Sequence, residues 1–414
     1  MVQLKSLKHN GIRIIDIPHI GLKIHINGET IKLDPKQEQM AIAWARKLST
    51  DYVEDPVFCK NFFEDFSKAL GRPGLTDEEI DFSPIIDYLE KERKRKKNMS
   101  KEEKKAAREK RKKIREQYQE EYGYAELNGE RVQIANYTAE PSCIFVGRGK
   151  HPLRGHWKEG PRQEDIILNH SPCDDMPEGN WKDIVWEPEC IWVAKWQDKL
   201  SGKWKYVWLS DNTPIKQRRE IEKFDQIKLV DENHKKIRST IMKTIKSDDK
   251  EKQMIAAATY LIDKFNLRVG DEKDDDEADT VGATTLRTEH MEIDGDVLKL
   301  SFLGKDAVQW KKQAKLPKIV ISVLKELLKE AEKREADKKQ VFQIGSREVN
   351  DFLNSIVEGL TAKVFRTYHA TTSVQEYLEE DDVEANNPDF EKKEAATMAN
   401  LQAAIICNHM KQEP

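Results

Sequence analysis

Two arginines in the second half of the sequence have neighbours that suit anion binding. Arg268 follows an apolar stripe at helical spacing that runs from Met254 to Phe265, so the sequence predicts a half-buried guanidinium where a helix ends. Such a group needs an anionic partner, and its planar set of donors matches phosphate. The alternative is a cation that interacts with the helix dipole. Arg366 precedes several hydroxyl side chains, which is typical of an anion pocket or of an ordinary helix surface.

A lysine and a histidine complete the set of candidate catalytic residues. Lys305 lies in SFLGKDA, at the tip of a predicted hairpin, where most lysines are simply solvated. His409 falls four residues after Ile405 and eight after Leu401, on the helix face that we expect these residues and Met398 to bury. A histidine there is either a satisfied core residue or a catalytic one.

Several common kinds of site are missing from the sequence. GRGKHP (147–152) resembles a phosphate-binding loop but has His151 where that loop needs Ser or Thr, and neither HExxH nor an EF-hand pattern occurs. The acidic run 271–279 imitates a metal site, but such runs are usually solvated loops. The five cysteines form no CxxC pair, which argues against a zinc site and a disulfide framework. We therefore expect no cofactor and no metal.

The candidate residues lie in a region that we expect to be mainly helical. From about residue 216 the pattern is helical, except for LRTEHMEIDGDVLKLSFLGKDAVQW. That stretch alternates apolar and polar residues around turns at Asp294-Gly295 and Gly304, which predicts a three-stranded meander. Lys305 would lie at one of its turns.

The first half of the chain predicts further elements. Asn27-Gly28 indicates a hairpin, and helices are expected over 37–48 and through NFFEDFSKAL. Ser100 with Glu103 predicts the start of a long charged helix. The segment ECIWVAKWQDKLSGKWKYVWLS predicts a hairpin with an aromatic face, which we interpret as core packing rather than base stacking.

Positive charge is concentrated in one segment. Residues 91–115 contain fifteen Lys and Arg against four Glu, whereas the whole chain has a net charge of −4. Lys94, Arg95, Lys96 and Lys97 could belong to a solvated helix or could contact a phosphate backbone, where each neutralised phosphate releases counterions. No apolar run approaches the ~20 residues of a bilayer span, and the N-terminus has no signal-peptide core, so we expect a soluble, intracellular protein.

Five stretches together resemble a known family. FNLRVGDEK, ADTVGATTLRTEH, FLGKD, EGLTAKVFRTYHAT and IICNH occur in the order and at the separations found in the core of eukaryotic type IB DNA topoisomerases. The resemblance extends through KNFFEDF, MSKEEK, IFVGRGKHPLRG and EDIILN, and so covers nearly the whole chain. It implies that Arg268, Lys305, Arg366 and His409 are catalytic residues.

The resemblance also implies a reaction. In the family, a tyrosine attacks a DNA phosphodiester to form a 3′-phosphotyrosine link, and the freed 5′-hydroxyl reverses the step after strand rotation. Supercoiled DNA is relaxed without ATP or metal. Arg268, Arg366 and His409 would stabilise the transition-state charge, and Lys305 would protonate the departing 5′ oxygen.

Further DNA contacts are expected from the same resemblance. Arg148 matches an arginine that enters the DNA near the cleavage site, and we expect Lys150 and Asp306 to contact DNA as well. Val146 stands where animal members typically have another arginine. This departure puts one DNA contact, and the response to camptothecin-type drugs, in doubt.

The nucleophile of the family is not found in this sequence. Its tyrosine lies in a Ser-Lys-x-Asn-Tyr setting, which neither Tyr368 nor Tyr377 has. We therefore expect this polypeptide to be inactive alone. It is either the large subunit of the two-subunit form of kinetoplastids, whose small subunit carries the tyrosine, or a core cut from a single chain. Val146 favours the first explanation.

The resemblance implies an α+β fold built as a multi-lobed clamp around double-stranded DNA. We expect residues 1–18 to begin a β-rich lobe, 19–105 to form a helical cap, 106–218 to complete the β-rich lobe, and 219–414 to form a mainly helical catalytic lobe resembling tyrosine recombinases. The nucleus is the expected location, with organellar DNA as a second one in the two-subunit form. The alternative functions are a non-catalytic DNA-binding scaffold and a tyrosine recombinase.

Overall fold

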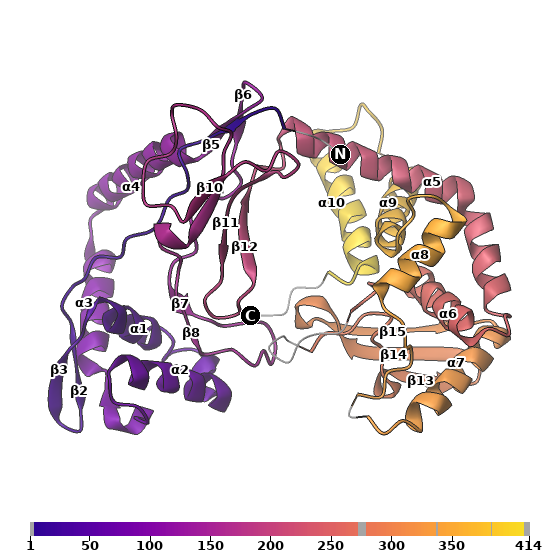
Figure 1. Cartoon of the computed structure of the whole chain (residues 1–414), viewed down its shortest axis with the longest axis horizontal. Helices are drawn as coiled ribbons and strands as arrows, with labels where there is room; N and C mark the ends of the chain where they lie inside the picture. Colours follow the sequence, from indigo (N-terminus) through magenta and orange to yellow (C-terminus); the bar gives the residue numbers. More distant parts are fainter. Residues whose placement is uncertain (1–3, 272–278, 337, 382, 410–414) are drawn as a thin grey trace. The chain divides into compact units, whose positions relative to one another are not determined.

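The chain divides into two compact units that both mix helices and strands. The computed structural model describes residues 4–271, 279–336, 338–381 and 383–409, and Figure 1 labels the elements. The first unit contains residues 1–147 and 151–218, and the second contains 148–150 and 219–414. The predicted α+β class is confirmed. Of the helices described, none is both long and apolar enough to cross a bilayer.

The described part of the first unit contains short strands and four complete α-helices. Its strands are β1 Leu7–Lys8, β2 Lys23–Ile26, β3 Glu29–Lys32, β4 Ile80–Asp81, β5 Tyr124–Leu127, β6 Glu130–Gln133, β7 Cys143–Ile144, β8 Trp157–Lys158, β9 Ile166–Asn169, β10 Asp183–Val185, β11 Trp192–Gln197 and β12 Trp204–Trp208. Its described helices are α1 Pro35–Ala45, α2 Pro56–Ala69, α3 Ser83–Asn98 and α4 Lys101–Tyr122.

Two separate hydrophobic cores hold the first unit together. One lies around α1, α2 and the β3-β2-β4 sheet, and stacks the Trp44 ring on Phe62 with centroids 4.5 Å apart. The other lies between the β1-β5-β6 and β10-β9-β11-β12 sheets. The predicted hairpin at Asn27-Gly28 is confirmed, since both residues have positive φ and join β2 to β3.

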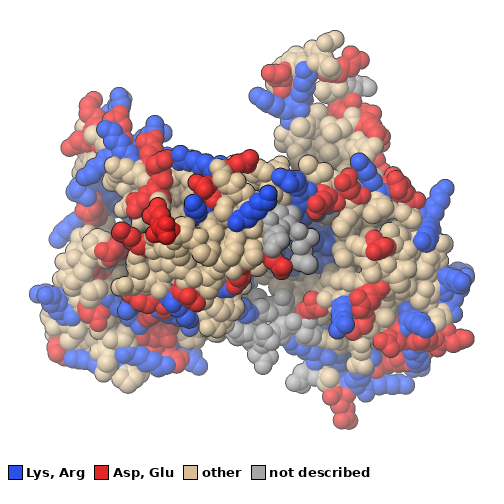
Figure 2. All heavy atoms as spheres, turned by 45° about the horizontal axis from the view of Figure 1, so that its top comes forward, with Lys and Arg blue, Asp and Glu red and all other residues tan. Residues whose placement is uncertain are grey.

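The basic segment 91–115 forms two successive helices. Ser100 accepts a hydrogen bond from the Glu103 amide, and the Glu103 carboxylate accepts one from the Ser100 amide, so the predicted start of α4 is confirmed. The basic residues before it belong to α3. On the face drawn in Figure 2, positive and negative side chains are interspersed. Charge therefore marks no DNA-binding surface on that face, and the positive excess of α3 and α4 is a local one.

The aromatic hairpin β11–β12 forms as predicted, but only two of the five aromatic side chains on its strands belong to the core. Trp192 and Trp196 are buried. A register shift after Trp192 and the inward side chain of Val207 turn alternate β12 residues outward, because neighbouring strand residues point to opposite faces. The core interpretation is therefore wrong for three residues that are at least 40% exposed: Trp204, Tyr206 and Trp208.

The second unit is mainly helical and encloses one meander. Its elements are α5 Pro214–Thr244, which begins in the first unit, α6 Lys250–Phe265, β13 Met291–Asp294, β14 Val297–Leu303, β15 Gln309–Lys315, α7 Lys318–Glu332, α8 Ser346–Ile356, α9 Ala362–Glu380 and α10 Asp389–Ile406. The predicted antiparallel meander β13-β14-β15 is confirmed. One core joins its buried face to α6, α7, α8 and α9.

Candidate functional site

Arg268 lies beyond helix α6 rather than in its last turn. The helix ends at Phe265 because Asn266 adopts the left-handed conformation (φ 59°) and its amide bonds to the Ile262 carbonyl. Arg268 follows two residues later and its side chain is exposed. The expectation of a half-buried guanidinium at the helix end is wrong, because the Asn266 cap turns the chain out of the helix before Arg268.

Lys305 lies in the turn between β14 and β15, as predicted. The Gly304 amide donates to the Val308 carbonyl at 2.9 Å, which closes the turn, and Lys305 begins a short 3₁₀ helix, Lys305–Ala307. The lysine side chain is exposed. Asp306 belongs to the same 3₁₀ helix, but its side chain lies outside the described part of the chain.

Arg366 is the buried member of the predicted set. Only 8% of it is exposed on α9, and its Nη1 and Nη2 donate to the carbonyls of Asn266 and Cys407, each at 2.9 Å. Burial, and then the positive charge of Arg268, lowers the pKa of Arg366 from its ordinary value. No carboxylate among the described residues forms an ion pair with it, so its charge remains available to an anion.

His409 follows the end of α10. The helix ends at Ile406, Asn408 has a positive φ of 53°, and the His409 amide donates to the Ala404 carbonyl at 2.8 Å. The imidazole is exposed. His409 is thus held at a capped helix end, and its side chain is not part of a core.

The face of α10 that the sequence predicted to be buried is exposed. Met398, Leu401 and Ile405 are 37%, 47% and 57% exposed. The helix instead buries Ala395 and Ala399 and packs against α9 (Figure 1), because these small side chains let the two helices approach closely. The prediction that His409 shares a buried face with the larger residues is therefore wrong.

The neighbouring cations affect how His409 titrates. Desolvation, and then the positive charges of Arg366, Arg268 and Lys305, lowers the pKa of His409 below its ordinary 6.5. The imidazole is therefore mainly neutral at neutral pH. A bound phosphate would favour the charged form and raise this pKa again.

Four segments of the second unit bring the predicted catalytic residues to one pocket. Arg268, Lys305, Arg366 and His409 all line a cavity of 320 Å³. Its other lining residues are mostly apolar or glycine and include Leu267, Val281, Gly282, Phe302, Gly304, Val308, Trp310, Cys407 and Asn408. No tyrosine is among the described lining residues. Three cations and an imidazole around one cavity suit the binding of an anion that gains charge during a reaction.

The structure offers no metal site within the residues that it describes. No group of three His, Cys, Asp or Glu is arranged there to hold an ion. Most of the acidic run 271–279 lies outside the described residues. All five cysteines are free thiols.

The segment 148–150 approaches the turn that carries Lys305. A Cβ at Gly149 would lie 2.6 Å from the Cβ of Ala307, and Gly149 has φ 57°, so the close approach and the backbone conformation both favour glycine. Arg148 and Lys150 on either side are exposed. Two of the predicted DNA contacts therefore lie next to the Lys305 turn.

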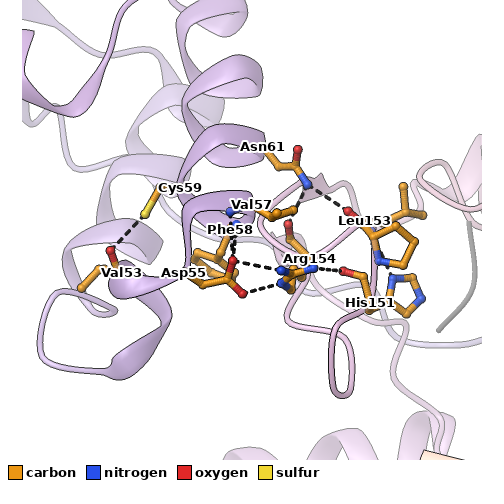
Figure 3. A network of polar contacts seen from close by, with 10 residues as sticks. Val53, Asp55, Val57, Phe58, Cys59, Asn61, His151, Leu153 and Arg154 are labelled. Atoms are coloured by element: carbon orange, nitrogen blue, oxygen red, sulfur yellow. Dashed lines mark hydrogen bonds and ion pairs between the residues drawn. The ribbon is translucent and has the colours of Figure 1, made fainter. Parts of the chain in front are cut away.

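An ion pair fixes the residues that follow this segment (Figure 3). The Arg154 Nε and Nη2 donate to Asp55 at 2.5 and 3.0 Å, and Nη1 donates to the His151 carbonyl at 2.9 Å. The Asn61 amide donates to the carbonyls of Pro152 and Arg154. The Arg154 hydrogen bond holds the pKa of Asp55 below its usual range. GRGKHP is thus anchored on its C-terminal side.

The other predicted DNA contacts lie on α3. Lys94 and Arg95 form exposed ion pairs with Glu90 and Glu92 at 3.7 and 2.9 Å, and Lys96 and Lys97 are exposed. None of the four lines the pocket. The solvated-helix and phosphate-contact interpretations both fit this arrangement.

Three residues around the pocket were not predicted from the sequence. Trp310 is 5% exposed and lines it, Asn266 bonds Arg366, and Lys312 donates to the Ile406 carbonyl at 3.0 Å. An asparagine directly after a helix is a C-cap signal and could have drawn attention to Asn266. Lys312 gave no such signal, because its partner lies 94 residues away in the sequence.

Two family descriptions cover almost the entire sequence. Residues 2–209 match the DNA binding fragment of eukaryotic DNA topoisomerase I, and residues 212–414 match its catalytic core. A structure of the XerH site-specific recombinase bound to palindromic difH aligns with 43% of the chain at 18% identity and a TM-score of 0.29, which is too low to bear on the fold.

Curated relatives give the same family. The chain is 35% identical to DNA topoisomerase 1 beta of Arabidopsis thaliana, 34% to DNA topoisomerase 1 of Candidozyma auris and 32% to that of Homo sapiens. These alignments cover 98%, 98% and 100% of the chain but 44%, 55% and 55% of the relatives. The chain therefore spans about half the length of the curated relatives that it matches. On these matches, the chain belongs to the eukaryotic DNA topoisomerase I family.

Proposed function

We propose that this chain forms the core of a type IB DNA topoisomerase that relaxes supercoiled double-stranded DNA by transient cleavage of one strand. The observation that carries the proposal is the convergence of Arg268, Lys305, Arg366 and His409 on one pocket. A tyrosine from outside this sequence completes the site, either on a small subunit or on a further part of the same polypeptide.

The pocket residues stabilise the pentacoordinate phosphorus that forms when the tyrosine attacks. The phenol loses its proton to water, its oxygen bonds to phosphorus, and the bond to the 5′ oxygen breaks. Arg268, Arg366 and His409 donate to the non-bridging oxygens, and one preorganised donor of this kind typically contributes about 3 kcal/mol. Arg366 needs little reorganisation because two carbonyls already hold its guanidinium.

Lys305 acts as the general acid in this proposal. Its exposed ammonium on the β14–β15 turn protonates the departing 5′ oxygen, and the neutral amine takes the proton back when the hydroxyl religates the strand. The cationic side chains supply the charge stabilisation, and the 3′-phosphotyrosine link preserves the bond energy, so the cycle needs no ATP.

DNA binding is proposed to use residues outside the pocket as well. Arg148 and Lys150 flank Gly149 beside the Lys305 turn, and Asp306 belongs to that turn. The basic residues 94–97 on α3 contact phosphates.

Reversing the four charges at 94–97 should flatten the dependence of DNA affinity on salt, because fewer counterions are released. A matched reversal of four exposed lysines on or just after α7 (Lys318, Lys325, Lys329 and Lys333) should leave the slope unchanged. If both variants keep the salt dependence of the unmodified chain, the basic residues 94–97 are only solvated.

The nucleophile is proposed to come from outside this sequence because the two tyrosines that lie nearest to Arg366 in the sequence do not face the pocket. Tyr368 lies 8% exposed on α9, where its hydroxyl donates to Asp231 at 3.1 Å. Burial and this hydrogen bond raise the pKa of Tyr368, which makes its phenolate harder to form. Neither Tyr368 nor Tyr377 lines the pocket.

A mixing experiment tests the proposal. Supercoiled plasmid in EDTA without ATP is incubated with this chain, with a separately expressed polypeptide that contains the Ser-Lys-x-Asn-Tyr stretch, or with both. Relaxation is expected only in the mixture, and the Tyr→Phe form of the added polypeptide should abolish it. Relaxation by this chain alone would overturn the proposal of an external nucleophile. DNA binding without relaxation in any mixture would favour a non-catalytic scaffold.

The proposed location is the nucleus, with organellar DNA as a second location if a small subunit exists. The support is the family together with the basic segment 91–115, which has the composition of a nuclear import signal. Imaging of a tagged chain, with the four charges at 94–97 reversed as the comparison, checks this location. Exclusion of the unmodified chain from the nucleus would contradict it.

A further inference from the structure

The end of helix α10 is fixed by three side-chain donors, two of which the proposed mechanism does not use. Ile406 is the last residue of the helix, where carbonyl groups have no partner within the helix. Its carbonyl accepts from Lys312 Nζ at 3.0 Å and from Asn266 Nδ2 at 3.4 Å. The next carbonyl, that of Cys407, accepts from Arg366. Three side chains from three elements therefore converge just before His409.

Lys312 is held there despite the cost of burying its charge. The side chain leaves β15 half-buried, and its ammonium lies 4.7 Å from the centre of the Trp310 ring. Burial lowers the pKa of Lys312. No carboxylate among the described residues lies within ion-pair distance of it. The Ile406 carbonyl at the negative end of α10 and the Trp310 ring thus compensate this ammonium.

Asn266 contacts both Arg366 on α9 and the end of α10, just before His409. It is 4% exposed, and its backbone carbonyl accepts from Arg366 while its side-chain amide reaches the Ile406 carbonyl and the Cys407 sulfur. A displacement of Asn266 would therefore move Arg366 and the end of α10 together.

Two further hydrogen bonds fix the backbone next to the His409 imidazole. The Asn408 amide side chain donates to the Gln309 carbonyl at 3.0 Å, and the His409 amide donates to Ala404. Gln309 and Lys312 belong to the same strand, β15, which follows the Lys305 turn. The strand thus links the turn that carries the lysine to the helix end that carries the histidine.

We propose that Lys312 and Asn266 are positioning residues that hold the end of α10, and thereby set where His409 and Arg366 meet the scissile phosphate. Neither is assigned to contact DNA. The effect on catalysis rests on the proposed function, whereas the effect on α10 can be measured without it.

The first test is hydrogen exchange of the complete chain without DNA. Lys312→Met removes the donor but keeps the apolar stem, and Asn266→Gly removes the side chain but keeps the left-handed cap. Each should speed exchange of the peptide covering residues 401–409 by about tenfold or more, while peptides from α7 keep their protection. Lys312→Arg should restore slow exchange. Lys311→Met, which removes the same charge from the exposed side of β15, should have no effect.

The second test uses single-turnover cleavage with the tyrosine-bearing polypeptide added. Lys312→Met should slow cleavage by between about tenfold and a hundredfold at unchanged DNA affinity, because small displacements of catalytic groups are costly. Unchanged exchange at 401–409 in both variants would overturn the proposal whether or not the chain relaxes DNA. Faster exchange with unchanged cleavage would overturn its catalytic part. If even the unmodified mixture fails to cleave, only the proposed function fails, and exchange still decides the structural claim.

Discussion

At the residue scale, the pocket combines one buried cation with two exposed ones. Arg366 is fixed by the carbonyls of Asn266 and Cys407, whereas Arg268 and Lys305 are exposed to solvent. A buried guanidinium is preorganised for an anion that arrives in one place. An exposed ammonium can follow a leaving group that moves. This division matches the proposed roles of stabiliser and proton donor.

The role of Lys305 can be separated from phosphate binding. Lys305→Ala should slow cleavage by about 10²- to 10⁴-fold with nearly unchanged DNA affinity, because general acids contribute rate rather than binding. The measurement is single-turnover cleavage with the tyrosine-bearing polypeptide present. A substrate whose 5′ bridging oxygen is replaced by sulfur should be cleaved almost equally by both proteins, since a thiolate leaves without a proton. A large loss of affinity would mean that Lys305 is only a phosphate contact.

The lowered pKa of His409 predicts proton uptake when DNA binds. The free imidazole is mainly neutral above its depressed pKa, and a phosphate in the pocket raises that pKa, so near pH 6.5 the complex holds more protons than the free chain. DNA affinity should therefore rise as the pH falls towards 6.5. Calorimetry in buffers of different ionisation enthalpy measures the uptake, and His409→Gln should remove most of it. Equal uptake by this variant would assign the proton to another group.

At the scale of elements, local signals predicted which elements form but not which faces they bury. Turn residues located the β13-β14-β15 meander, and Ser100 located the start of α4. The apolar stripe of α10 predicts a buried face, yet the helix packs through Ala395 and Ala399. Helical spacing shows that residues share a face, but the shape of the neighbouring helix decides which face is covered.

The candidate site, like the elements, was only partly predictable from the sequence. Resemblance to a family supplied the four residues that line the pocket, but spacing alone left each of them with an ordinary structural explanation. The contacts that hold them were not predictable, because Arg366 bonds to residues 100 and 41 positions away. Such pairs exist only after α6, α9 and α10 have packed.

The approach of segment 148–150 to the Lys305 turn gives a matched test. Gly149→Ala should destabilise the second unit more than Gly295→Ala does. Both glycines have φ 57°, but only Gly149 faces another atom, the Ala307 Cβ, whereas a Cβ at Gly295 meets nothing within 4 Å. The shared backbone cost is about 1 kcal/mol, and any excess reports the clash. Urea unfolding measures both variants. Equal losses would mean that the segment moves away without cost.

At the scale of the whole molecule, each unit has its own hydrophobic cores. The second unit has one core around the meander and its helices, and the first has two. Trp310 is the only tryptophan of the second unit, whereas the other eight lie in the first. Its ring lines the pocket, so its fluorescence can report on the site while the remaining tryptophans are replaced or subtracted.

Separate cores predict separate losses of stability. Phe365 in the second unit and Phe62 in the first are both fully buried, and replacing a buried phenylalanine by alanine typically costs about 3–5 kcal/mol. Phe365→Ala should therefore speed hydrogen exchange throughout the core of the second unit and leave slow-exchanging peptides of α2 protected. Phe62→Ala should do the reverse. Exchange measured peptide by peptide in sub-denaturing urea distinguishes the cases, because a single cooperative unit would lose protection in α2 and α9 together in both variants.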